Sequence, residues 1–292
     1  MTLTVAAPLV GSTPALMAAA RALGASGGSA GAARLLGQLY DPDLAVEHVL
    51  SCLNSEPALA ARVLKVANSP YYRLSGSVGT VVRAVQLLGL SAIRGIAAAG
   101  CLDRLTPTRA GTAFEPEAFR RHSLAAACAA QQLARACGAG LEGEAFMAGL
   151  LHDIGLLLLV KADAEAMARF QPPACDCSAS ALAAERAHFG TTHEDCASLL
   201  VRAWSLPDWL QVGLCDHHAN RPLPATRPLR GVQALPALLA LADHCAHRAG
   251  YPLWPVCGSE PLPALAEALG LSAAQIDAVV AGLPEIVSRL AP

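Results

Sequence analysis

The sequence predicts an all-α fold, and three observations support this prediction. Apolar residues make up 54% of the 292-residue chain but aromatic residues only 4%, because most of the excess is Ala and Leu, which favour helices. Apolar positions recur at helical spacing along much of the chain. No segment shows the alternation of apolar and polar residues that is typical of a strand.

Composition and charge exclude several broad classes of protein. Charged residues make up 15% of the chain, which favours a large buried core over disorder. The formal net charge of −2 provides no overall field that would attract nucleic acid or an anionic membrane. The longest apolar run is interrupted by His152 and Asp153, so no run reaches the length needed to span a membrane.

The cysteines indicate a reducing environment. The ten cysteines are scattered without a framework of close pairs, and the first residues lack the basic region of a signal peptide. We therefore expect reduced, mostly buried thiols in a cytoplasmic protein. Cys175 and Cys177 form a lone C-x-C, which is weak evidence for a metal or redox site because no second pair accompanies it.

The N-terminal part begins with a segment of low complexity. Residues 1–30 are rich in Ala, Gly and Ser and are expected to be flexible, apart from a short helix near Pro14–Leu23. Asp41-Pro42-Asp43 and Ser55-Glu56-Pro57 are start signals for two helices with apolar faces. Asn68-Ser69-Pro70 is expected to end the second of them.

Two further helices follow a polar loop. The first is expected over Val81–Leu88, and Gly89 separates it from a second that Ser91 can cap. The pair could be interpreted as a DNA-binding helix-turn-helix. However, the second helix offers only Arg94 near its start, whereas a recognition helix needs several exposed polar residues. Packing is the better explanation of the pattern.

The second half of the chain contains longer helical patterns after a polar break at Thr106–Gly111, which is a candidate subdomain boundary. Each expected helix except the terminal one carries polar residues among the apolar ones on its inner face. The expected elements and these residues are Pro116–Cys137 with His122, Glu144–Val160 with His152-Asp153, a helix capped by Thr191 or Thr192 with His193, a helix starting at Leu206-Pro207-Asp208 with His217, Leu235–Arg248 with Asp243, and the terminal amphipathic helix Ser272–Leu290.

The adjacent His152-Asp153 pair lies inside the wholly apolar run AGLLHDIGLLLLV. Burying either side chain without a partner would cost several kcal/mol, so a metal ion or a hydrogen-bonded polar cluster must satisfy them. A single His on an apolar face is more often a core residue than a ligand. Several such residues on separate helices favour a shared site, and imidazole with carboxylate suits Fe, Mn, Zn or Ni.

The residues suggest one or two metal ions. A single-metal site could use His122, His152, Asp153 and Asp243. A second metal could share Asp153 and add His193, His217 and, as a further candidate, His218. Two metals at such a site could hold a phosphoryl group and generate a hydroxide nucleophile.

The order of these residues resembles the HD superfamily of metal-dependent phosphohydrolases, and the match is closer to its HDOD branch (HD-related output domain). The resemblance covers about residues 32–248. It rests on the segments DPDLAVEHVLSCLNSEPALAARVLKVANSPYY, VVRAVQLLGLSAIRGIA, FRRHSLAAACAAQQLA, AGLLHDIGLLLL, HEDCASLLVRAWSLPDWL and LADHCA.

The resemblance implies an HD-like helical bundle with an additional N-terminal helical subdomain. On this basis we expect a flexible segment at 1–30, an N-terminal HDOD subdomain at 31–112, an HD-like subdomain with the polar centre at 113–255 and a C-terminal helix at 256–292. HDOD proteins are similar in fold to HD-GYP cyclic-dinucleotide phosphodiesterases. They are mostly regarded as bacterial signalling or regulatory modules.

Two departures from the active hydrolases argue against catalysis. Active HD-GYP enzymes have a Lys after HD-x-G, where this chain has Leu156, and Leu cannot supply a cation to a phosphate. The segment ANRPLPATR after His217-His218 lacks the Glu-x-x-Asp-Gly-x-Gly-Tyr-Pro motif. Arg221, Arg227 and Arg230 could bind an anion, although a solvated loop is the alternative.

We therefore expect a bacterial signalling module that binds a partner protein or a small anionic ligand, with no direct contact to nucleic acid or membrane. Its His/Asp centre is expected to hold one or two divalent metals. The alternative is a metal-dependent phosphohydrolase or phosphodiesterase acting on nucleotides or cyclic dinucleotides, with Asp153 as the candidate catalytic residue.

Overall fold

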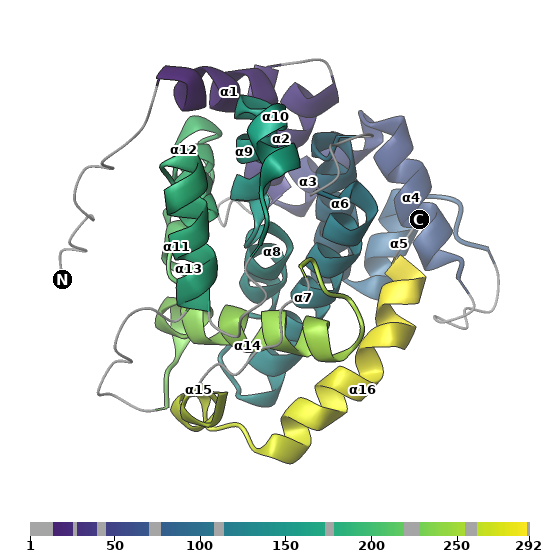
Figure 1. The fold of residues 1–292 in the computed structure, drawn as a ribbon. Helices are drawn as coiled ribbons and strands as arrows, with labels where there is room; N and C mark the ends of the chain where they lie inside the picture. Colours follow the sequence, from purple (N-terminus) through teal and green to yellow (C-terminus); the bar gives the residue numbers. More distant parts are fainter. Residues whose placement is uncertain are drawn as a thin grey trace.

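The computed structural model describes residues 14–25, 28–39, 45–69, 77–107, 114–172, 178–218, 228–254 and 262–290, and these contain helices but no strand (Figure 1). The predicted all-α class is therefore confirmed. Several features named above lie wholly or partly outside these residues. They include Asp41-Pro42-Asp43, Pro70 of Asn68-Ser69-Pro70, Thr106–Gly111, the Cys175–Cys177 pair, the segment 219–227 and parts of the segments 1–30 and 256–292.

The N-terminal part consists of six helices. They are α1 (Pro14–Ala25), α2 (Gly28–Leu39), α3 (Val46–Asn54), α4 (Pro57–Ala67), α5 (Val81–Leu88) and α6 (Leu90–Leu105). Helix α1 agrees with the short helix expected near Pro14–Leu23, whereas the start of α2 lies within the segment that we expected to be flexible. Leu16, Ala20 and Leu23 of α1 are buried, and the helix packs against α9. This apolar contact explains why residues 14–25 are a folded part of the molecule.

The helix pair α5 and α6 is joined by Gly89. Its φ of 83° lies in the left-handed region, which favours Gly and lets α6 start at once. Ser91 therefore lies inside α6 and does not cap it, because Gly89 is the N-cap residue. Ten of the sixteen residues of α6 are buried, so this helix has no broad polar face with which to read DNA.

The second part of the chain contains the remaining helices. They are α7 (Pro116–Ala136), α8 (Glu142–Leu151), α9 (Ile154–Ala162), α10 (Ala164–Arg169), α11 (Ser178–Phe189), α12 (His193–Ala203), α13 (Asp208–Leu214), the 3-10 turn η1 (Gly231–Ala234), α14 (Leu235–Arg248), α15 (Leu262–Leu269) and α16 (Ala273–Leu290). We did not predict α10, α11 or α15. The single helix expected over Glu144–Val160 is instead divided into α8 and α9 at His152-Asp153.

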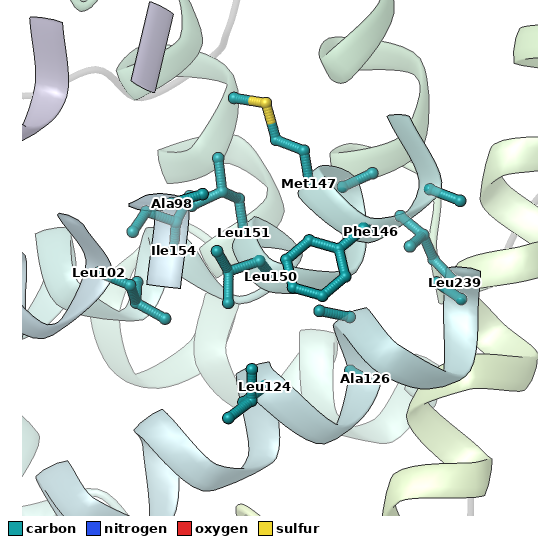
Figure 2. Packing of buried hydrophobic residues seen from close by; sticks show 14 of the residues in the cluster. Ala98, Leu102, Leu124, Ala126, Phe146, Met147, Leu150, Leu151, Ile154 and Leu239 are labelled. Atoms are coloured by element: carbon teal, nitrogen blue, oxygen red, sulfur yellow. The ribbon is translucent and has the colours of Figure 1, made fainter. Parts of the chain in front are cut away.

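Helix α8 lies at the centre of the molecule, between α6, α7 and α14. Phe146, Met147 and Leu150 of α8 are buried among residues of these neighbours (Figure 2). A Cβ atom at Gly149 would lie 2.8 Å from the carbonyl oxygen of Ala126. The absence of a side chain at Gly149 therefore allows α8 to approach the α7 backbone closely, which brings the end of α8 beside the inner face of α7.

One helical stretch among the described residues, Glu142–Ala162, is long and apolar enough to cross a membrane, but 89% of its apolar 18-residue window is buried within the protein. A second candidate, formed by α15 and α16 together, is bent by 100° at the break between the helices. Both stretches form extensive contacts with other helices, so their apolar character is explained by packing.

Buried cysteine thiols provide a first test of this core. Burial raises the pKa values of Cys101 and Cys128 to about 12. Since the thiolate is the nucleophile, we expect both to react with iodoacetamide roughly three orders of magnitude more slowly than an ordinary thiol at pH 8. Partly buried Cys52 should react faster. Peptide mass spectrometry of folded and urea-unfolded protein measures this, and rapid labelling of Cys128 in the folded protein would contradict the packing.

Candidate metal centre

Seven polar side chains from five segments converge at one place. His122 comes from α7, His152 and Asp153 from the break between α8 and α9, and His193 is the first residue of α12. His217 and His218 follow α13 directly, and Asp243 lies on α14. The structure thus brings together all seven residues that we predicted as metal ligands, and their ligand atoms form two groups that could each hold a metal ion.

The first group consists of His122, His152 and Asp243. The Nε2 atoms of the two imidazoles are 3.2 Å apart. The Nε2 atom of His122 is also 3.2 Å from Oδ1 of Asp243. Three potential ligand atoms therefore face one another at the separations found between neighbouring ligands of one metal ion.

The second group consists of Asp153, His193, His217 and His218. The Nε2 atom of His193 is 3.3 Å from that of His217 and 3.0 Å from that of His218. The Oδ1 atom of Asp153 lies 3.6 Å from the His193 Nε2 atom. As in the first group, the imidazoles present Nε2 to a common point.

The carboxylate of Asp153 lies between the two groups. Its Oδ2 atom is 3.2 Å from Nε2 of His152 and 3.5 Å from Nε2 of His122. Its Oδ1 atom instead faces His193 and His217, at 3.6 and 3.7 Å. One oxygen is thus directed at each group, so Asp153 would supply one ligand atom to a metal ion held by either group.

Hydrogen bonds of the Nδ1 atoms, which point away from the centre, fix the orientation of the imidazole rings. The Nδ1 atoms of His122, His152 and His217 donate to the backbone carbonyls of Tyr251, Gly149 and Leu214, at 2.8, 2.8 and 3.0 Å. A carbonyl oxygen only accepts, so the proton is on Nδ1. When such a ring is neutral, its Nε2 atom therefore presents a lone pair to the centre.

The chemistry of the donor set fits a metal. Imidazole nitrogens and carboxylate oxygens that face one another at 3.0–3.7 Å need positive charge between them, from protons or from a cation, because their lone pairs would otherwise repel. A divalent cation supplies that charge, and Fe, Mn, Zn and Ni all bind imidazole and carboxylate. Hydrogen bonds from Nδ1 to carbonyls are also the usual outer contacts of histidines that bind metal.

Electrostatics keep the carboxylates in the form that binds a cation. Burial alone would raise the pKa of Asp153, but the charge and hydrogen bonding of His152 outweigh it, so the pKa is held well below its usual range. Burial likewise opposes ionisation of Asp243. Hydrogen bonds from His122 and His247 outweigh that effect and also hold its pKa well below the usual range.

In the second group, the pKa values of two histidines are shifted in opposite directions. Burial and the neighbouring charged rings hold the pKa of His218 well below its usual value, which favours the neutral ring. Burial also opposes the charge on His193, but the carboxylate of Glu185 raises its pKa to about 10. Nε2 of His193 would therefore have to lose its proton to serve as a metal ligand.

One side of the centre is open. The side chain of Asp243 is 29% exposed and that of His247, which lies one turn later on α14, is 20% exposed. The Nε2 atom of His247 is 3.4 Å from Oδ1 of Asp243, and its ring packs edge-on against His122. Solvent or a ligand can thus approach the first group from α14. We did not predict His247, although its spacing four residues after Asp243 was a usable signal.

The start of α12 is closely fitted to α9. Thr192 accepts a hydrogen bond from the amide of Asp195, whose carboxylate accepts from the amide of Thr192 in return. This capping box begins the helix at His193 and identifies Thr192, not Thr191, as the cap. A Cβ atom at Gly155 would lie only 1.9 Å from the carbonyl oxygen of His193. The two backbones can meet only because position 155 is Gly.

None of the three arginines that we considered for anion binding is described as part of the His/Asp centre. Arg221 and Arg227 lie outside the described residues, whereas Arg230 is exposed and donates to the carbonyl of Leu229. Leu156, at the position where active HD-GYP enzymes have Lys, is 1% exposed and belongs to the core. That position therefore directs no polar group toward the centre.

Comparisons with known proteins agree with this architecture. The model of the HDOD domain matches residues 30–220. An HDOD domain protein of unknown function from Geobacter sulfurreducens is 25% identical, with a TM-score of 0.64 over 94% of this chain and 96% of that chain. A candidate phosphohydrolase from Shewanella amazonensis SB2B is 24% identical, with a TM-score of 0.67 over 96% and 99% of the two chains. No curated protein matches the sequence.

A third solved structure, a candidate metal-dependent phosphohydrolase from Shewanella amazonensis SB2B, is 19% identical, with a TM-score of 0.61 over 89% of this chain and 90% of that one. These similarities define the class of the protein as an HD-like helical domain. Because the family model covers most of its length, the chain belongs to the HDOD family, as its motifs predicted.

Proposed function

We propose that this HDOD protein is a signalling module whose buried centre holds two divalent metal ions and binds a small anionic ligand through them. The observation that supports this most strongly is the pairing of two groups of acceptor atoms around one carboxylate, Asp153. His122, His152 and Asp243 would hold one metal, and His193, His217 and His218 the other. The bound metals would supply positive charge to an oxyanion such as a phosphate.

The accessible side of the centre supports a ligand-binding role. Asp243 and His247 are the partly exposed members of the cluster, so an anion would approach along α14. His247, which contacts Asp243, is placed to donate a hydrogen bond to such a ligand. A cytoplasmic location and regulation through a partner protein are parts of the same proposal.

Hydrolysis of a phosphate ester is the second candidate, because the complete ligand set and its open side would also suit a phosphohydrolase. Leu156 argues against it, since this position offers no cation to neutralise a phosphate during reaction. The seven residues that position a ligand would be common to both functions, so the two candidates differ only in turnover.

A screen of nucleotides and cyclic dinucleotides with Mn²⁺- or Fe²⁺-loaded protein separates the two. We expect weak or no turnover by the wild-type protein. The His152→Ala variant removes a ligand atom, whereas His48→Ala alters an exposed histidine on α3 and is the matched control. Sustained metal-dependent turnover that His152→Ala abolishes and His48→Ala retains would reverse the ranking in favour of a phosphohydrolase.

A further inference from the structure

The two halves of the centre differ in what lies behind their histidines. In the first group, the Nδ1 atoms of His122 and His152 donate to backbone carbonyls. In the second group, His193 instead faces the carboxylate of Glu185. Among the described contacts, this is the only ligand histidine whose Nδ1 atom lies within 3.0 Å of a side-chain carboxylate.

Glu185 contacts both the imidazole ring and the backbone amide of His193. Both of its carboxylate oxygens lie 2.8 Å from Nδ1 of His193, and Oε2 also accepts a hydrogen bond from the His193 backbone amide at 2.8 Å. The Glu185 side chain is 3% exposed. A buried carboxylate therefore fixes both the ring and the main chain of one ligand residue.

Local structure brings Glu185 to this position. It lies near the end of α11, and Gly190, with φ of 73°, allows the chain to turn back before the capping box of α12. Glu194 makes a weaker contact in the same half. Its Oε1 atom is 3.5 Å from Nδ1 of His217, whose hydrogen bond at 3.0 Å goes to the carbonyl of Leu214.

We propose that Glu185 is a positioning residue that sets the metal affinity of the half formed by His193, His217 and His218. This inference rests on the proposed metal-binding function. A carboxylate behind an imidazole increases the basicity of the ligand nitrogen and holds the ring in the orientation needed for binding. The half that contains His122 lacks this support, so its metal should respond little to changes at Glu185.

Titration of the metal-free protein with Co²⁺, followed by visible absorption, tests the proposal. We expect two equivalents to bind to the wild-type protein. In Glu185→Gln, which keeps the side-chain volume but removes the charge, one equivalent should bind about 10- to 100-fold more weakly, and the other should change by less than about twofold. Glu185→Ala should show a larger effect on the same equivalent. Glu165→Ala, which alters a side chain that is 89% exposed, is the control.

The outcomes separate this inference from the proposed function. If the wild-type protein binds no Co²⁺, both fail. If it binds two equivalents and Glu185→Gln does the same with unchanged affinities, the role of Glu185 is refuted but the metal centre remains. A purely structural role would lower the melting temperature of the metal-free protein and leave the Co²⁺ affinities of the folded variant unchanged, which would also overturn the inference. Glu185→Gln decides the question if Glu185→Ala does not fold.

Discussion

Gly155→Ala is expected to destabilise the protein by about 3 kcal/mol or more and to displace His193. The new Cβ atom would lie 1.9 Å from the carbonyl oxygen of His193 and 2.7 Å from its carbonyl carbon. Both are backbone atoms at the start of a capped helix, so neither can rotate away. Overpacking of a core usually costs about 1–3 kcal/mol. Because this clash is with rigid backbone atoms, we expect its cost to reach or exceed the upper limit of that range.

Thermal unfolding and metal analysis measure this effect. For a chain of this size, we expect the melting temperature to fall by roughly 6–12 °C and the metal of the His193 half to be lost. Gly282→Ala on α16 is the matched control, because the nearest heavy atom to its Cβ atom would be 3.9 Å away. That change should be neutral or stabilising by up to about 1 kcal/mol. A Gly155→Ala protein with wild-type melting temperature and metal content would show that α9 and α12 do not meet as described.

Asp153→Ala is expected to remove both metal ions, unlike a change in either half alone. Each oxygen of this carboxylate faces a different group of histidines, so its loss takes one ligand atom from each. If bound metal is present at about 1,000 times its Kd, it stabilises the folded protein by about 4 kcal/mol. Loss of that contribution should lower the melting temperature by roughly 8–16 °C.

Elemental analysis of purified protein, combined with thermal unfolding with and without chelator, tests this prediction. Asp153→Asn is the second variant, because it keeps the volume of the side chain and removes only the charge. Asp208→Ala, which removes an exposed carboxylate on α13, is the control and should retain its metal. Full metal content in a folded Asp153→Ala protein would contradict a bridging role.

Strong local signals made several helices predictable from the sequence. The helix start at Pro116 agrees with α7, and the pattern over Leu235–Arg248 agrees with α14. In both, a Pro near the start and a long apolar face leave few alternatives. The break at His152-Asp153 was not predicted, because the run contains no Pro and its two glycines, Gly149 and Gly155, lie within α8 and α9 and not at the break. His217 was expected on the face of a helix that in fact ends before it.

The polar centre itself was predictable from the cost of burying polar groups. Each of the histidines lay in a pattern that required an inward orientation, and their number required a shared explanation. Glu185 was missed for a different reason. It lies in a segment whose Ala-rich composition favours a helix but shows no apolar periodicity, so nothing in the sequence indicated which face of α11, and hence which carboxylate, points inward. Only the packing of α11 beside the start of α12 reveals its contact with His193.

Anomalous X-ray scattering from crystals of the Mn²⁺-loaded protein tests the central claim most directly. We predict two anomalous peaks, one on each side of the Asp153 carboxylate. The first should lie among His122, His152 and Asp243, and the second among His193, His217 and His218. Crystals without a peak at Asp153, or with Mn²⁺ bound only elsewhere, would contradict the assignment of these seven side chains to a metal centre.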